Sequence, residues 1–229
     1  MADIQSFLTS IQTDFYLLQE VDENATRTYK ITERAMLEES FTADNQDTVF
    51  AQNWDSPFLF YLLTQPHGKS VSGILSASRF NITSSLRRSL PVEDSVMKIV
   101  DLDRCYSVSR TPVSNGRELI LCNLHLSAYT SDGTIVTEQL RLLLADMAAE
   151  YDKGNYVICG GDFNKDLLGN SSRYFGVSGQ PYTWAQPIQN ELFEELPLSL
   201  AAGTIAPSCR VAEVPYNPQQ FVLTLDHVM

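Results

Sequence analysis

The middle of the chain carries a strand–helix–strand pattern, which constrains the fold more than any other feature of the sequence. The apolar runs Leu119–Leu126 and Tyr156–Cys159 each predict a buried strand. Between them, apolar side chains recur at helical spacing up to Gly154, and this predicts a helix that ends at the glycine. The recurring positions are Leu140, Leu143, Leu144, Met147 and Tyr151. Two strands joined through a helix by a short return are typical of α/β proteins.

The segments on either side of this unit predict shorter elements. No internal repeat or low-complexity tract interrupts the chain, so residues 1–229 are interpreted as a single domain. The expected elements are a helix over Ile4–Ile11, a strand over Phe15–Val21, an apolar run over Phe58–Leu63, a loop over Gly68–Gly73, long loops with short elements over 165–218, and a strand that begins at Phe221.

Composition excludes some classes of function. The chain has 16 Lys and Arg against 28 Asp and Glu, a net charge of −12. This balance disfavours binding of nucleic acid through bulk charge, although it leaves room for a locally positive site. The four cysteines follow no spacing that would predict a zinc site. No run approaches the roughly 20 apolar residues of a membrane span, and the amino terminus lacks the features of a signal peptide. A cytoplasmic location is the default expectation, unless a preceding segment carries a leader.

Polar side chains stand where several of the predicted strands end. Glu20 follows the strand that starts at Phe15, and ligands of open α/β sheets bind beyond the carboxyl ends of strands. Asn123 and His125 share one face of their strand, because side chains alternate with a period of two. A polar pair on so apolar a strand indicates either a functional site or a hydrogen-bonded core histidine. For Glu20, the alternative is an ordinary surface carboxylate.

The segment Gly160-Gly161-Asp162-Phe163-Asn164 gives the strongest local signal. Its glycines allow a sharp turn or a close approach of the backbone, and Asp162 and Asn164 share a face. A turn closed by the Asp or Asn side chain is the alternative interpretation. Asp226 is a lone carboxylate in the last apolar run, where the alternative is a surface residue of an edge strand. Together these residues predict a site for Mg²⁺, which prefers one or two carboxylates with water and phosphate oxygens.

Three motifs in this order resemble the endonuclease/exonuclease/phosphatase superfamily, whose members include deoxyribonuclease I, sphingomyelinases and inositol-phosphate phosphatases. They are Leu18-Gln19-Glu20-Val21-Asp22, Asn123-Leu124-His125-Leu126 and Gly161-Asp162-Phe163-Asn164. The segment from Ser72 to Phe80 and that around Asp226 are also similar, and the run from Trp54 to Ala185 resembles a bacterial branch. The resemblance implies an α/β fold with four layers, in which two mixed β-sheets are flanked by helices. It also implies hydrolysis of phosphate esters with Mg²⁺ or Mn²⁺.

The resemblance assigns roles to the matching residues. Glu20 matches the glutamate that binds the metal, and Asp162 matches the aspartate that positions or deprotonates the attacking water. Asn164 matches a residue that hydrogen-bonds the phosphate. Asn123 and His125 match the strand whose histidine contacts the scissile phosphate or acts as a general acid. Asp226 matches the aspartate that orients the final catalytic histidine of the family.

Four further residues are candidate substrate contacts. Arg104 or Arg27 is expected to neutralise phosphate charge. His67 and Lys69 lie in a Gln-Pro-His-Gly-Lys segment that predicts either contacts to a phosphate-ester substrate or an exposed loop.

Two features depart from the family pattern. The family starts with a strand that carries an Asn near the metal and ends with a Ser-Asp-His motif, and neither is found in this sequence. His227 does not replace the final histidine, because it and Asp226 are adjacent and point to opposite faces. We therefore expect a domain that lacks its first and last strands, with little or no phosphoesterase activity. The alternatives are a degenerate member that acts as a binding module and an unrelated α/β protein with chance motifs.

Overall fold

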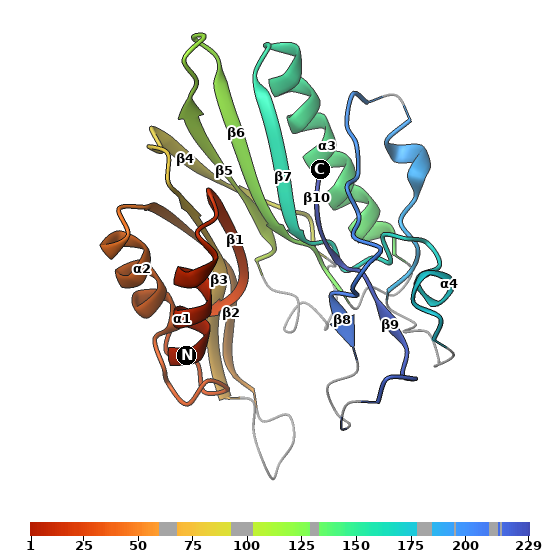
Figure 1. The fold of residues 1–229 in the computed structure, drawn as a ribbon, viewed down its shortest axis with the longest axis horizontal. Coiled ribbons are helices and arrows are strands. Elements are labelled where there is room, and N and C mark those ends of the chain that lie inside the picture. Colours follow the sequence, from red (N-terminus) through yellow and green to blue (C-terminus); the bar gives the residue numbers. More distant parts are fainter. Residues whose placement is uncertain are drawn as a thin grey trace.

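Two β-sheets pack face to face with helices on their outer faces, as the computed structural model shows (Figure 1). The structure describes residues 1–59, 68–92, 103–128, 133–177, 185–194, 196–210, 215 and 217–229. Contacts between the sheets join β1 to β6 and β7, β3 to β6, and β2 to β5. This order of helix, sheet, sheet and helix confirms the predicted α/β class with four layers. Within the described residues, no helix has the length and apolar character needed to cross a membrane.

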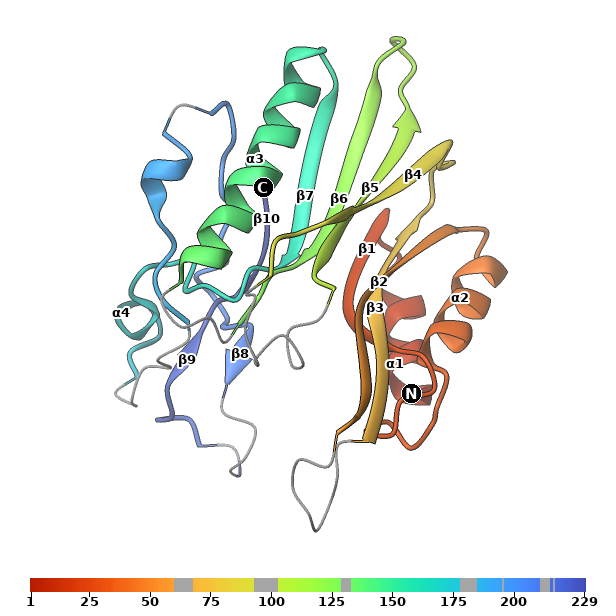
Figure 2. The same ribbon diagram turned by 180° about the vertical axis from the view of Figure 1, so that it is seen from behind.

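The smaller sheet has three strands in the order β1-β3-β2, and both pairs are antiparallel. Its outer face is covered by two helices, which bury Tyr16, Leu37 and Phe41 against the sheet (Figure 2). The elements are α1 (Ala2–Ile11), β1 (Phe15–Asp22), α2 (Glu33–Ala43), β2 (Asp47–Leu59) and β3 (Gly68–Ser78).

The predicted loop over Gly68–Gly73 is wrong, because these residues form the first half of β3. Small residues in this half leave room for the large side chains of β2. A Cβ atom on Gly73 would lie 2.3 Å from the ring of Phe50. The polar and glycine-rich composition therefore reflects close packing between strands and not a turn.

The larger sheet has five strands in the order β10-β7-β6-β5-β4, of which only β6 and β7 run parallel among the pairs that the structure describes. The helix between them covers the outer face and packs Leu140, Leu143 and Met147 against Cys122 and Leu124. The central strand–helix–strand prediction is confirmed. The elements are β4 (Ser84–Ser89), β5 (Cys105–Pro112), β6 (Glu118–His125), α3 (Thr134–Asp152), β7 (Tyr156–Asp162) and β10 (Asp226–Val228).

The segment between β7 and β10 consists of long connections with short elements, as predicted. These are α4 (Ser171–Phe175), a 3-10 helix (Asn190–Leu192), and the paired strands β8 (Cys209–Arg210) and β9 (Val222–Leu223).

Candidate active site

Three strands of the larger sheet bring polar side chains to one edge. The parallel strands β6 and β7 end at His125 and Asp162, which are partners in the register. The antiparallel strand β10 begins at the same edge, where Asp226 is the partner of Asp162. The fold therefore gathers His125, Asp162 and Asp226, although they are far apart in the sequence.

The glycines before Asp162 are required by the close approach of β6. Gly161 has a φ of 140°, and a Cβ atom there would lie 2.1 Å from the carbonyl oxygen of Leu124. No other residue fits this position without moving the strand. The predicted close approach of the backbone is confirmed, and the neighbour is the adjacent strand.

Asn164, two residues after Asp162, holds the carboxylate of Asp162 in place. Its backbone N–H donates to Oδ1 of Asp162 at 2.8 Å, and its side-chain Nδ2 donates to the carbonyl oxygen of Leu126 at 2.7 Å. Asn164 has a φ of 49° and is buried. The turn expected as the alternative interpretation is thus present, and it orients the carboxylate toward His125.

Burial and charge keep His125 neutral. Its Nε2 lies 3.7 Å from Oδ2 of Asp162, and its buried Nδ1 has no hydrogen-bond partner within the described part of the chain. Burial, followed by the positive charges of Arg104 and Arg27, lowers the pKa of His125 well below its usual value. A hydrogen-bonded core histidine would have a partner for Nδ1, so this geometry favours a histidine poised for a ligand.

Asp226 destabilises the charged form of Asp162. Burial, followed by the negative charge of Asp226, raises the pKa of Asp162 to about 7. Burial also raises the pKa of Asp226. A cation or a proton between these carboxylates would relieve the repulsion. Perturbed carboxylates in such a setting are typical of functional sites.

Glu20 reaches toward this edge from the smaller sheet. It has a φ of 55° within β1, where the register with β3 shifts between Leu18 and Val21. Such a bulge redirects a side chain. Glu20 is 59% exposed, and its Oε2 lies 3.3 Å from Nη1 of Arg27. Its negative charge contributes to the raised pKa of Asp162, so the two carboxylates lie near each other.

Arg27 is anchored by a residue that the sequence analysis did not single out. Asp22 is fully buried and accepts from Nε and Nη2 of Arg27 at 2.8 and 2.7 Å. No local pattern of the sequence indicates this ion pair, because the bulge at Glu20 interrupts the alternation of β1 before Asp22. The pair holds the guanidinium beside Glu20, and Arg27 also lowers the pKa of His125.

Asn123 connects the two sheets. It is fully buried, and Nδ2 donates to the carbonyl oxygens of Leu18 at 3.2 Å and Leu75 at 3.1 Å. Its Oδ1 accepts from Nε2 of Gln19 at 2.7 Å. Asn123 thus shares a face with His125, as predicted, while its hydrogen bonds fix β1 against β6.

The remaining candidate substrate contacts are Arg104, Lys69 and His67, and only Arg104 is buried near the site within the described residues. Arg104 is buried, lies 5.7 Å from the ring centre of Trp54, and affects the pKa values of His125 and Asp162. Lys69 is exposed on β3 and makes no ion pair or side-chain hydrogen bond with the residues above within the described part of the chain. His67 lies outside the described residues.

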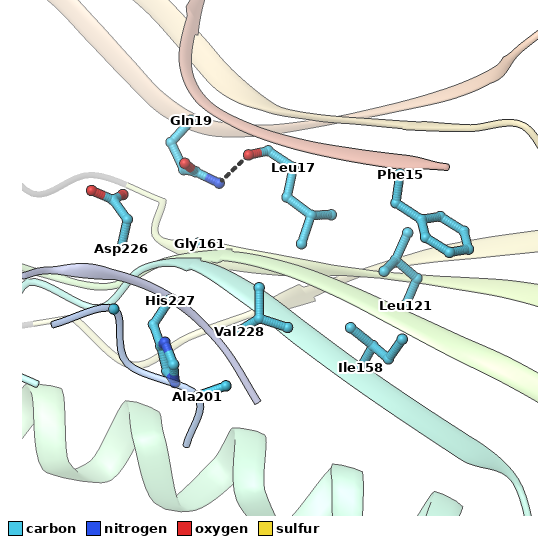
Figure 3. A pocket seen from close by; sticks show the side chains of 11 residues that line it. Phe15, Leu17, Gln19, Leu121, Ile158, Gly161, Ala201, Asp226, His227 and Val228 are labelled. Atoms are coloured by element: carbon cyan, nitrogen blue, oxygen red, sulfur yellow. Dashed lines mark hydrogen bonds between the residues drawn. The ribbon is translucent and has the colours of Figure 1, made fainter. Parts of the chain in front are cut away.

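A pocket of about 520 Å³ opens beside Asp226, between β1 and the strands β7 and β10 (Figure 3). Figure 3 shows that Asp226 and His227 point to opposite sides of β10, as expected for adjacent residues of a strand. His227 packs against Phe163, with ring centres 6.2 Å apart. The pocket is mainly apolar, and Phe15, Leu17, Leu121, Ile158 and Val228 line it.

The donors at this edge suit a hard divalent cation. No group of three or more His, Cys, Asp or Glu side chains is close enough to hold a metal within the described residues. Mg²⁺ needs only one or two carboxylates, since water and phosphate oxygens supply its other ligands. Glu20 and Asp162 provide such carboxylates, and the repulsion at Asp162 favours a positive ion there.

Comparisons with known proteins place the fold. No model of a known protein family matches the chain, and no curated protein matches it. The solved catalytic domain of human Nocturnin, with bound sulfate, is similar with a TM-score of 0.60 and 16% identity, over 100% of this chain and 74% of that one. ANGEL2, a 2′,3′-cyclic phosphatase, has the same TM-score and identity, over 100% and 73%.

A bacterial structure is similar over part of its length. The endonuclease/exonuclease/phosphatase protein from Beutenbergia cavernae has a TM-score of 0.57 and 20% identity, over 83% of this chain and 46% of that one. The chain therefore spans less than half of that relative. With the two sheets and their flanking helices, these likenesses show that the chain shares the fold of these solved structures, which is the fold that the resemblance to the endonuclease/exonuclease/phosphatase superfamily implies.

Proposed function

We propose that the chain is a divalent-metal-dependent hydrolase of phosphate esters. The observation that carries this proposal is the meeting of Asp162, Asp226 and the neutral, buried His125 at one sheet edge, with Glu20 close by on the other sheet. ANGEL2 is a 2′,3′-cyclic phosphatase, and its similarity in fold supports the same class of reaction here.

Each residue contributes a distinct step. Glu20 and Asp162 would hold the metal, which supplies polarisation of a phosphoryl oxygen when bound. Asp162 also positions the attacking water by accepting a hydrogen bond from it. Neutral His125 donates a hydrogen bond to a phosphate oxygen. Arg27 and Arg104 offset phosphate charge.

The alternative is a binding module that keeps the fold without turnover. One observation favours it: the carboxylate of Glu20 is already paired with Arg27. A metal at Glu20 would have to compete with this ion pair. Such a module would bind Mg²⁺ and a phosphate ester, and would release product at no measurable rate.

Hydrolysis of a bis-aryl phosphodiester and an aryl monophosphate separates these functions. We expect slow release of the aryl alcohol with Mg²⁺ or Mn²⁺ and its loss in EDTA. The rate should be low, because the sequence contains neither the Asn-bearing first strand nor the Ser-Asp-His motif of the family. The D162N and H125Q variants should reduce the rate by about 10²-fold or more, whereas E39Q, a charge change at an exposed site on α2, should not. Equal hydrolysis in EDTA or by D162N would contradict the proposal.

The substrate is proposed to be a phosphate ester other than long nucleic acid. The net charge of −12 opposes binding of a polyanion through bulk charge. Binding of duplex DNA with a steep dependence on salt would overturn this part of the proposal and favour a nuclease.

A further inference from the structure

A second pocket lies at the amino-terminal end of α3. It has a volume of about 480 Å³, and Gly133, Thr137, Arg141 and Lys165 are among its lining residues. The helix follows β6 and runs back along the sheet, so its first turn lies at the edge where β7 ends (Figure 1). Lys165 follows Asp162 by three residues, which limits the distance between their Cα atoms to roughly 10 Å.

Lys165 is a buried cation that lacks a partner. It is 8% exposed and makes no ion pair or hydrogen bond within the described part of the chain. Burial lowers its pKa, and no neighbouring charge contributes. A Cβ atom on Gly133 would lie 3.3 Å from its Nζ, so the ammonium group points at the start of α3. The stem of the side chain is buried while Lys165 lines the pocket, so its ammonium group is available to an anion there.

The start of α3 adds further positive potential. Gly133 is the N-cap residue, and it provides no side-chain hydrogen bond to the helix. The first turn of this 19-residue helix contains no acidic residue, and Gly133 and Thr137 at its start line the pocket, where the helix dipole is positive. Within the described residues, the lining of the pocket includes Arg141 and no acidic side chain. Backbone donors, an ammonium and a guanidinium suit a phosphate-sized oxyanion.

We propose that this pocket binds a second phosphate group of the substrate, separate from the group that is hydrolysed at Asp162. The inference rests on the proposed function, because that function supplies the hydrolysis. The binding of the anion is inferred separately, from Lys165 and the start of α3. It narrows the substrates to phosphate esters that carry a second phosphate group near the scissile one.

Titration of the wild-type protein with inorganic phosphate and pyrophosphate tests the pocket directly. In EDTA and 150 mM NaCl, we expect saturable binding of one anion by calorimetry. Backbone amide shifts in nuclear magnetic resonance should centre on 133–137 and Lys165. Shifts that are absent there, or that spread over the surface and vanish at this salt concentration, would overturn the proposal.

Matched lysine variants test the role of Lys165. K165M should weaken binding of pyrophosphate by about tenfold or more, because a charge-assisted hydrogen bond is lost. K153M is the control, since Lys153 lies just after the other end of α3 and is exposed. Equal affinity of K165M and wild type would contradict the proposal. If K165M does not fold, the wild-type amide shifts still decide. D132N, next to Gly133 in sequence, should bind the anion at least as tightly as wild type.

A pair of substrates tests whether the anion belongs to the substrate. A dinucleoside monophosphate and its 5′-phosphorylated form differ by one phosphate, and we expect wild type to prefer the phosphorylated form in kcat/KM by about tenfold. K165M should lose most of this preference. Equal preference in both proteins would overturn the assignment to substrate. Hydrolysis of neither compound, with intact amide shifts, would contradict the proposed function alone.

Discussion

At the scale of single residues, Asp162 couples the stability of the fold to pH. Its pKa in the folded protein is about 7, above the ordinary value of 3.8, because it is buried beside Asp226. Between these two values the folded state binds more protons than the unfolded state, so the free energy of unfolding falls as pH rises. In EDTA we expect a loss of about 2–4 kcal/mol between pH 4 and pH 8 from this group, and a smaller loss for D162N.

Thermal unfolding at a series of pH values measures this effect. The D226N variant serves as the control, because it removes the neighbouring charge and should move the decline in stability to lower pH. If D162N and wild type decline in parallel, other groups cause the pH dependence.

Asn123 is expected to stabilise the contact between the sheets. Its removal in N123A leaves the carbonyl oxygens of Leu18 and Leu75 without these donors, and it removes the acceptor of Gln19. Unsatisfied buried groups of this kind should lower the free energy of unfolding by about 2–4 kcal/mol. Asn81 is exposed, so N81A should change the free energy of unfolding by less than about 0.5 kcal/mol. Chemical denaturation compares the variants, and an unchanged midpoint for N123A would refute the structural role.

At the scale of elements, the pairing of β6 with β7 depends on a glycine. G161A would place a Cβ atom 2.1 Å from the carbonyl oxygen of Leu124, so the strands must separate. We expect a loss of about 3 kcal/mol or more in stability, together with a displaced Asp162. Gly116 also has a positive φ, of 81°, but no atom lies within 4 Å of its Cβ position. G116A should therefore cost only about 1 kcal/mol. Similar losses in both variants would show that backbone conformation, and not the close approach, sets the cost.

Periodicity explains which elements the sequence could predict. Alternation in β6 placed Asn123 and His125 on one face and Leu124 on the other, and the structure agrees, because Leu124 packs with the core under α3. The Gly160-Gly161 pair correctly indicated a close approach. By contrast, the prediction of a loop over Gly68–Gly73 is wrong, since small residues that fit beside a bulky neighbouring strand have the composition of a turn.

The parts of the site that the sequence did not predict depend on contacts between segments that are distant in the sequence. The bulge at Glu20 and the ion pair between Asp22 and Arg27 are set by the pairing of β1 with β3, which no local pattern encodes. Likewise, the partner-free position of Lys165 follows from the packing of the segment after β7 against the start of α3.

At the scale of the whole molecule, the candidate metal site bridges the two sheets. Glu20 belongs to the smaller sheet and Asp162 to the larger one. The sheets also meet through packed side chains and through hydrogen bonds that include those of Asn123 and the bond from Arg87 to the carbonyl oxygen of Gln52. An ion held by both carboxylates would bind only the folded arrangement. It would therefore stabilise the entire fold by mass action and not only the strand ends.

We expect 10 mM Mg²⁺ to raise the free energy of unfolding by about 1–2 kcal/mol at pH 7.5, relative to EDTA. E20Q and D162N should each lose most of this gain, because one of the two carboxylates no longer carries charge. The E39Q variant removes the same charge from an exposed position on α2 and should keep the gain. Thermal unfolding with Mg²⁺, with Ca²⁺ and at matched ionic strength in NaCl separates binding from screening. An equal gain in NaCl, or in E20Q, would place the stabilising ion elsewhere than between the sheets.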